Sequence, residues 1–340
     1  MGIGIPNVHE AWTWYRKNFS MNIPVFEEAA TAELMLPYTG GKPHDRHAIL
    51  ALNMQGGGGF EIWQYTSRTP QPASFEPKLG DYGIHICKIK SMDAVASFKN
   101  FDKNYLISSN VEHSPNGTKH FFVRDPYDNI FQVIESDNHY IKNKNETGGV
   151  FGAIIGVSDI EKSIDFYKNV LGYDVIDWQG EGQFEDFDSI NTSKHLYKRA
   201  ILSHSNVRKG SFSQLLGPSQ IELVQNLTEN GQKIYKDRYW GDLGFIHLCF
   251  DIIGMKKLQV ACEKAGHPFT VDSANSFDMG EAAGHFSYIE DPDGALIEFV
   301  ETHKIPILKK IGWYLDIRKR DPLKPLPKWM IKSLGLNKKQ

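Results

Sequence analysis

The sequence is poor in the features that mark secreted, membrane-spanning and nucleic-acid-binding proteins. It has three cysteines in 340 residues, and its first segment has no basic stretch followed by an apolar one. This argues against a disulfide framework and a secretion signal, and favours reduced thiols in a cytoplasmic compartment. The net charge is -3, no block of Lys and Arg lies in the body of the chain, and no apolar run approaches membrane-spanning length. We therefore expect a soluble globular protein with no nucleic acid partner and no stable membrane insertion.

The most informative feature that is present is an internal repeat, because self-similarity along a chain predicts repeated structural units. Residues 5–19 resemble residues 157–171, with Tyr15 opposite Tyr167. Further pairs follow in the same order: RHAIL (46–50) with KRAIL (198–202), FEIWQ (60–64) with IELVQ (221–225), DYGIHICKI (81–89) with DLGFIHLCFDI (242–252), and RDPYDNIFQVIE (124–135) with EDPDGALIEFVE (290–301). The sequence therefore predicts two similar halves.

Within each half, a short strand, a helix and several strands follow one another twice. This order predicts an α+β fold built from four βαβββ units. We place one domain in residues 1–140 and a second in residues 150–303, with a polar, Lys- and Asn-rich linker between them. Residues 304–340 form a basic, aromatic tail that is expected to pack on the domains through aromatic residues such as Trp329, to bind a partner, or to touch a membrane surface.

Three residues able to bind a metal lie in the middle of apolar strand sequences. They are Glu222 in QIELV, His247 in FIHLC and Glu298 in LIEFV. Any one of them alone is explained by an alternating strand with one wet face. Two carboxylates that meet inside a barrel, however, repel each other unless a cation or a proton lies between them. Together the three favour a divalent ion, and imidazole and carboxylate ligands suit Zn²⁺, Fe²⁺, Ni²⁺, Co²⁺ or Mn²⁺.

The segments GVSDIEKSIDFYKNVLGYDVI, IHLCFDI and EDPDGALIEFVE resemble the vicinal oxygen chelate superfamily. That superfamily includes glyoxalase I, methylmalonyl-CoA epimerase, extradiol catechol dioxygenases and metal-free bleomycin-resistance proteins. The resemblance implies two tandem domains, each made of paired βαβββ modules that form a cup-shaped half-barrel. It also implies that Glu222, His247 and Glu298 occupy three of the four ligand positions of the glyoxalase and epimerase branch. At the fourth position, where family members commonly have His, this chain has Gly152.

The first half has its own residues at the corresponding positions. These are Glu61, His85 and Gln132, and the first-strand position falls at or before Met1. Under the resemblance, this half is a degenerate scaffold copy or a second binding cup. In the second half, either three ligands and water molecules hold the metal, or a nearby histidine such as His285 or His204 replaces the ligand missing at Gly152.

The leading functional hypothesis is a metal-dependent lyase or isomerase of the glyoxalase type. The resemblance implies a small substrate with oxygen atoms on adjacent carbons, an enolate-like intermediate, and Glu298 or Glu222 as the base. The first alternative is an extradiol-type ring-cleaving dioxygenase, which Gly152 disfavours because that class needs a ligand there. The second alternative is a non-catalytic protein that sequesters a small molecule. The sequence does not determine the oligomeric state, and a homo-oligomer is possible.

Overall fold

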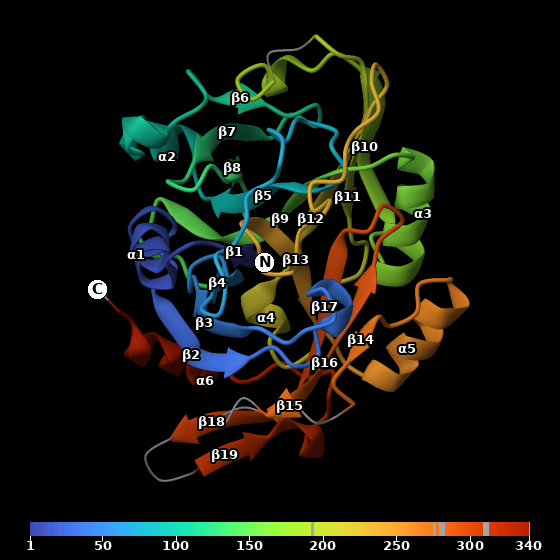
Figure 1. Ribbon diagram of the computed structural model, residues 1–340. Helices are drawn as coiled ribbons and strands as arrows, with labels where there is room; N and C mark the ends of the chain where they lie inside the picture. Colours follow the sequence, from blue (N-terminus) through green and yellow to red (C-terminus); the bar gives the residue numbers. More distant parts are fainter. Residues whose placement is uncertain (192–193, 275–276, 279–282, 309–312, 340) are drawn as a thin grey trace.

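The computed structural model describes residues 1–191, 194–274, 277–278, 283–308 and 313–339. Its main feature is a pair of curled sheets flanked by helices (Figure 1). The fold class is α+β with two half-barrels, as the sequence predicted. Within these residues, no helix is both long and apolar enough to cross a membrane.

The first sheet combines strands from the start of the chain with strands from its end. These are β1 (Gly2–Gly4), β2 (Ile23–Thr31), β3 (Asp45–Leu52), β4 (Gly59–Tyr65), β13 (Gly244–Asp251), β14 (Val271–Asp272), β15 (Phe277–Asp278), β16 (Ala283–Glu290) and β17 (Leu296–Thr302). Their order is β14-β16-β17-β13-β1-β4-β3-β2, with β15 paired to β16 beside this path. The two groups of strands meet where β1 pairs antiparallel with β13.

The second sheet takes all its strands from the middle of the chain. These are β5 (Gly83–Ser91), β6 (Glu112–His113), β7 (Lys119–Arg124), β8 (Ile130–Glu135), β9 (Thr147–Gly156), β10 (Val175–Gly182), β11 (Tyr197–Ser203) and β12 (Gln220–Asn226). Their order is β10-β11-β12-β9-β5-β8-β7-β6. Each sheet therefore contains strands from both halves of the repeat. The domain boundaries read from the sequence stay a prediction, but neither sheet is built from one half alone.

The helices lie around the sheets. They are α1 (Val8–Phe19), α2 (Ala94–Asn100), α3 (Ile160–Leu171), α4 (Ser213–Leu216), α5 (Met255–Lys264) and α6 (Lys328–Lys332). The repeated helices α1 and α3 begin in the same way, because Asn7 and Asp159 each accept hydrogen bonds from two backbone N–H groups of the first turn. They also end alike, with left-handed backbone at Ser20 and Gly172.

A repeated tyrosine–aspartate contact explains the turn motifs found in the sequence. The hydroxyl of Tyr15 in α1 donates to Asp125 (2.6 Å), and that of Tyr167 in α3 donates to Asp291 (3.0 Å). The second oxygen of each aspartate accepts backbone N–H groups of its own turn, at two and four residues further on. The Asp-Pro motif thus fixes a hairpin turn and the helix beside it at the same time.

Strand alternation decides which side chains enter the concave faces. On β4, Phe60 and Ile62 belong to a large apolar core that also contains residues of α1 and α3. Trp63 and Tyr65, one residue out of phase, belong to a separate cluster on the concave side of the first sheet. We call this concave side cup A. The concave side of the second sheet, lined by Ile86, Ile154, Val224 and their neighbours, is cup B.

The C-terminal tail forms a hairpin and a short helix. The hairpin strands are β18 (Lys304–Leu308) and β19 (Trp313–Asp316), and α6 follows. Leu326 and Ile331 are buried against Ile23 and Met54, whereas Trp329 is 64% exposed. The tail therefore packs on the body of the protein, but through aliphatic residues and not through Trp329.

Candidate metal centre

Three side chains of cup A converge on one point. Glu61 comes from β4, His247 from β13 and Glu298 from β17. The Nε2 atom of His247 lies 3.3 Å from Oε2 of Glu61 and 3.2 Å from Oε2 of Glu298. One ligand atom from each residue can be chosen so that all three lie within 4.8 Å of one another. The cluster thus joins one residue of the first half to two residues of the second.

A bulge in β13 aims His247 into cup A. The register between β1 and β13 shifts at this point, so that Gly2 pairs with His247 and Ile3 pairs with Phe245. The first strand leaves the room that the imidazole fills, because a Cβ atom at Gly2 would lie 2.3 Å from the ring of His247. The position beside the histidine therefore requires glycine.

The charges of the cluster are unbalanced. Burial alone would lower the pKa of His247, but the carboxylates of Glu298 and Glu61 outweigh it and raise the pKa to about 9. Burial acts in the opposite sense on Glu298, yet His247 and hydrogen bonds from neighbouring side chains lower the pKa of that carboxyl. One of those donors is the hydroxyl of Tyr288, 2.9 Å from Oε1 of Glu298. Among the ion pairs of the described residues, no Lys or Arg reaches either carboxylate.

This donor set fits a divalent ion. Zinc–ligand bonds of about 2.0–2.1 Å in a tetrahedral arrangement place ligand atoms about 3.3–3.4 Å apart, and the two separations from His247 Nε2 are 3.3 and 3.2 Å. Neither ring nitrogen of His247 has a partner in hydrogen-bond geometry within the described chain. One imidazole and two carboxylates suit Zn²⁺, Mn²⁺, Fe²⁺, Co²⁺ or Ni²⁺, and they leave further coordination positions open.

Aromatic rings enclose the histidine while the carboxylates keep contact with solvent. The ring of Trp240 lies parallel to that of His247 with centroids 6.2 Å apart, and Tyr288 meets it edge-on at 5.5 Å. The side chain of His247 is fully buried, whereas those of Glu61 and Glu298 are 21% and 12% exposed. A small molecule can therefore reach the carboxylates without displacing the histidine.

A cavity of about 400 Å³ adjoins the cluster. Its walls include Trp240, Ile246 and Leu296, of which Ile246 precedes His247 and Leu296 pairs with it in the ladder. Tyr38 and Lys233 line the same cavity. Glu61, His247 and Glu298 do not line it, so the cavity lies beside the cluster and does not contain it.

The structure separates Glu222 from His247 and Glu298, which corrects the expectation that the three share one cup. Glu222 lies on β12 in cup B, where it is fully buried and forms ion pairs with Lys88 and Arg199. Burial alone would raise its pKa, but the two cations outweigh it and lower the pKa to about 2. Arg199 also binds Asp186 at 2.8 Å. Two protein cations thus do in cup B what a metal ion would do in cup A.

The other sequence candidates do not join the cluster of cup A, with the exception of Glu61. His85 and Gln132 lie on strands of the second sheet, and burial lowers the pKa of His85 to about 4. His285 lies on the face of β16 opposite to Tyr288 and pairs with Asp272. His204 contacts the carbonyl oxygen of Gly172 (2.6 Å). No side chain fits at Gly152, because its Cβ atom would lie 1.7 Å from the carbonyl oxygen of Gln220.

One assignment from the repeat is displaced by a residue. In the ladders, His247 pairs with Gly2 on β1, and the corresponding pair in the second sheet is Ile86 with Ile154. The counterpart of His247 is therefore Ile86, and not the neighbouring His85. The register of β5 and β9 shifts at His85 just as that of β13 and β1 shifts at Ile246, so His85 occupies the unpaired bulge position and not the ligand position. The sequence does contain this offset, because with Asp81 aligned to Asp242 the residue opposite His247 is Ile86 and not His85.

Comparison with known proteins agrees with the fold. Residues 149–299 match the model of the Glyoxalase/Bleomycin resistance protein/Dioxygenase superfamily. The chain has the vicinal oxygen chelate fold, and this segment belongs to the superfamily. Outside the segment, the two half-barrels extend the vicinal oxygen chelate architecture to both halves of the chain.

Individual proteins with low sequence identity to this chain include glyoxalase-type enzymes and a protein described as a putative dioxygenase. A lactoylglutathione lyase from Pseudomonas putida is 25% identical over 154 residues, which are 44% of this chain and 82% of that protein. A glyoxalase I variant from Zea mays superposes with a TM-score of 0.52 and 13% identity, over 88% of this chain and 91% of the other. A protein described as a putative dioxygenase from Bacillus subtilis gives a TM-score of 0.57 and 12% identity, over 100% and 95%. At such identities the two structures establish the fold alone.

Proposed function

We propose that cup A binds one divalent metal ion and catalyses a lyase or isomerase reaction of the glyoxalase type. The observation that carries this proposal is the convergence of Glu61, His247 and Glu298 in the absence of any Lys or Arg ion pair among the described residues. The relative named lactoylglutathione lyase supports the reaction class. The substrate we propose is a small molecule with oxygen atoms on adjacent carbons.

Glu61, His247 and Glu298 would hold the ion, and the two carboxylates would have different further roles. When bound, the ion supplies positive charge that stabilises negative charge on a substrate oxygen. Glu298 is fixed by the hydroxyl of Tyr288, which suits a permanent ligand. Glu61 is the more exposed carboxylate, and among the described residues the one ion pair of its side chain is with His247. Glu61 is therefore the better base for a proton on the carbon next to the substrate carbonyl, in the role expected of Glu298 or Glu222.

The surrounding rings limit the water that reaches the reacting atoms. Trp240 and Tyr288 lie on two sides of His247, and Trp63 packs edge-on against Trp240 with centroids 4.6 Å apart. The indole N–H groups of both tryptophans are buried and have no acceptor within the described chain. In this proposal they are donors available to a polar atom of the substrate, and the adjoining cavity takes the rest of that molecule.

A ring-cleaving dioxygenase is the second candidate, because a protein described as a putative dioxygenase shares the fold over the whole chain. Non-haem iron oxygenases of the common type use two histidines and one carboxylate. Cup A offers one histidine and two carboxylates. The donor set therefore favours the lyase or isomerase over the dioxygenase. A cytoplasmic location and a homo-oligomer stay predictions from the sequence and the family.

Metal content and proton exchange test the proposal together. We expect reconstituted protein to bind an equivalent of Zn²⁺, Mn²⁺ or Ni²⁺ that His247→Gln loses, as measured by elemental analysis after dialysis. His285→Gln is the matched control, because this histidine of the same sheet faces away from the cluster. Identical metal content in wild type and His247→Gln would overturn the metal site.

The reaction class is tested on a panel of thiohemiacetals of 2-oxoaldehydes. Proton exchange at the carbon next to the carbonyl is followed by NMR in D₂O. We expect Glu61→Gln to slow the exchange by about 10²–10⁴-fold, the usual contribution of a positioned base, while metal remains bound. Oxygen uptake with catechols and Fe²⁺, in the absence of such exchange, would instead establish the dioxygenase.

A further inference from the structure

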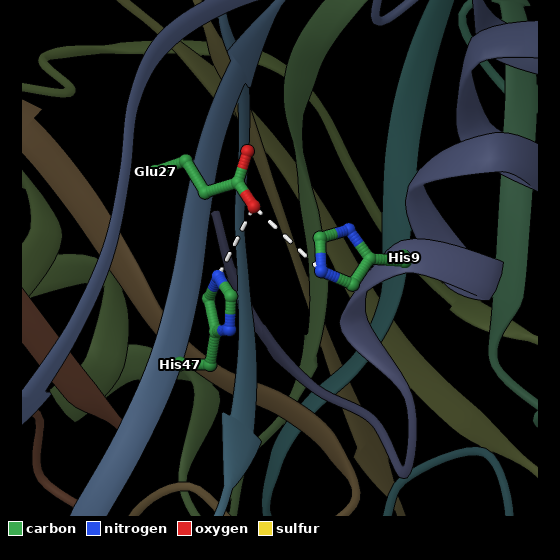
Figure 2. Close-up of side chains that lie close together, drawn as sticks. All are labelled: His9, Glu27 and His47. Carbon is green, nitrogen blue, oxygen red and sulfur yellow. Dashed lines mark hydrogen bonds and ion pairs between the residues drawn. The ribbon is translucent and has the colours of Figure 1, made fainter.

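A second group of side chains of the types that can ligate a metal lies on the outer surface of the first sheet. His9 projects from the first turn of α1, Glu27 from β2 and His47 from β3 (Figure 2). Their side chains are 61%, 43% and 26% exposed, respectively. Odd-numbered residues of β3, such as Ile49, belong to the core under α1, so His47 lies on the face opposite to cup A. This group is therefore separate from the candidate metal centre.

Both imidazoles approach the same carboxylate oxygen. The Nε2 atom of His47 lies 3.2 Å from Oε1 of Glu27, and the Nε2 atom of His9 lies 3.6 Å from it (Figure 2). The two rings are nearly perpendicular, with centroids 5.2 Å apart. One ligand atom from each residue can be chosen so that all three lie within 4.8 Å of one another. The observed nitrogen–oxygen separations are close to the roughly 3.3 Å edge of a tetrahedral zinc site, so small side-chain rotations are enough to close it.

The corresponding place in the other half of the molecule has different chemistry. Asp159 is the N-cap of α3 as Asn7 is of α1, so that Glu161 corresponds to His9. Gln179 on β10 corresponds to Glu27 on β2, and its amide donates to Glu161 at 3.0 Å. An ordinary hydrogen bond therefore joins helix and sheet there. Among the described residues of these two corresponding places, only the one on the first sheet has two imidazoles around one carboxylate.

We propose that His9, Glu27 and His47 bind a divalent transition-metal ion of the Zn²⁺ type on the outer surface. Two imidazole nitrogens select such ions over Mg²⁺ and Ca²⁺, which prefer oxygen ligands. The ion would tether the start of α1 to β2 and β3, elements that belong to three separate stretches of sequence. Because three protein ligands leave a tetrahedral position for water, and because the side chains are exposed, the bound ion is exchangeable.

Zinc titration calorimetry on the full chain, paired with elemental analysis after dialysis, tests this site. The variants are His47→Gln and Glu27→Gln, with Glu161→Gln as the matched control on the other half. We expect each of the first two to lose one bound zinc ion or at least tenfold in affinity, and the control to bind as wild type does. Zinc should also raise the melting temperature of wild type by more than that of His47→Gln. Unchanged stoichiometry and affinity in His47→Gln would overturn the proposal.

The result does not depend on the candidate centre in cup A. In His247→Gln the outer site is intact, and we expect it to bind one zinc ion that the double variant His47→Gln/His247→Gln loses. A double variant that still binds as much zinc as His247→Gln would exclude the outer site. Loss of metal in His247→Gln alone, by contrast, reports on cup A.

Discussion

Cup A and cup B contain carboxylates at corresponding positions but balance them differently. Glu61 faces Gly2 on one neighbouring strand and Leu50 on the other, and Glu222 faces Ile154 and Ile201 in the same way. In cup B, Lys88 and Arg199 neutralise Glu222. In cup A the only ionisable partner of Glu61 among the described ion pairs is His247. Protein cations thus neutralise the carboxylate of cup B, whereas His247 is the one ionisable partner of the two carboxylates of cup A among the described ion pairs.

Three more pairs of corresponding ladder positions hold different residues in the two cups. Lys88 in cup B corresponds to Cys249 in cup A, since each pairs with the residue on the last parallel strand. That residue is Gln132 in cup B and Glu298 in cup A. Across the hairpin, Phe122 faces Gln132 and Tyr288 faces Glu298. Cup B therefore has an ammonium where cup A has a small thiol, and an apolar ring where cup A has a hydroxyl donor.

Removing one cation from cup B has the largest expected effect on stability. Lys88→Met leaves Glu222 and Gln220 without their shared donor in a fully buried place. We expect the free energy of unfolding in urea to fall by roughly 3–5 kcal/mol, the usual cost of breaking one side of a buried pair. The double variant Lys88→Met/Glu222→Met should recover a large part of this loss, because it removes the unpaired charge as well. Equal losses in the single and double variants would contradict this account of cup B.

Acid should weaken the ion pairs of Glu222 and so lower the free energy of unfolding. The pKa of Glu222 is about 2 in the folded protein against an ordinary 4.5, so its contribution to stability is complete above pH 4.5 and is lost as the pH falls toward 2. Over this range we expect a loss of roughly 3 kcal/mol from this group alone. Urea unfolding of Glu222→Gln between pH 5 and 2 should show a correspondingly flatter pH dependence than wild type. Parallel curves would show that Glu222 is not the acid-sensitive group.

A lysine placed in cup A at the position that Lys88 occupies in cup B should weaken metal binding. Cys249→Lys puts an ammonium beside Glu298, where Cys249 is exposed on the concave face. Repulsion between this charge and a divalent ion a few ångströms away is worth several kcal/mol even at an effective dielectric constant of 20. We expect metal affinity in calorimetry to fall by about 100-fold or more, with melting temperature little changed. Cys249→Ser, which adds no charge, should bind metal as wild type does.

The sequence predicted the fold because its signals are local. The caps of α1 and α3 and the Asp-Pro turns each depend on residues that are close along the chain, and they lie where the repeat placed them. Tyr15 and Tyr167 also lie at matching places of the repeat, although their aspartate partners are 110 and 124 residues away in the sequence. The same kind of signal identified His247 and Glu298 as polar residues in apolar strands. In the structure these two lie together, on the adjacent strands β13 and β17.

The partner of these two residues could not be predicted in this way. Glu61 and Glu222 have equally suitable surroundings in the sequence, and nothing local tells which of them meets β13. The choice depends on which central strands pair across each sheet, β1 with β13 and β5 with β9. The neutralising role of Arg199 was equally hidden, because an arginine in a strand usually lies at the surface. Long-range strand pairing, not residue chemistry, decided which carboxylate faces the histidine.

The smallest change makes one position of cup A identical to its counterpart in cup B. Tyr288→Phe removes the hydroxyl that donates to Oε1 of Glu298 at 2.9 Å and keeps the ring. A carboxylate ligand that loses its supporting hydrogen bond typically weakens metal binding by about 10-fold, and the free energy of unfolding should change by about 1 kcal/mol. Phe122→Tyr is the reciprocal control: it offers a donor to Gln132, whose amide atoms have no partner within the described chain, and should leave metal affinity in calorimetry unchanged. If Tyr288→Phe binds metal as tightly as wild type, the hydroxyl does not orient Glu298, and the lack of any Lys or Arg ion pair alone distinguishes the two cups.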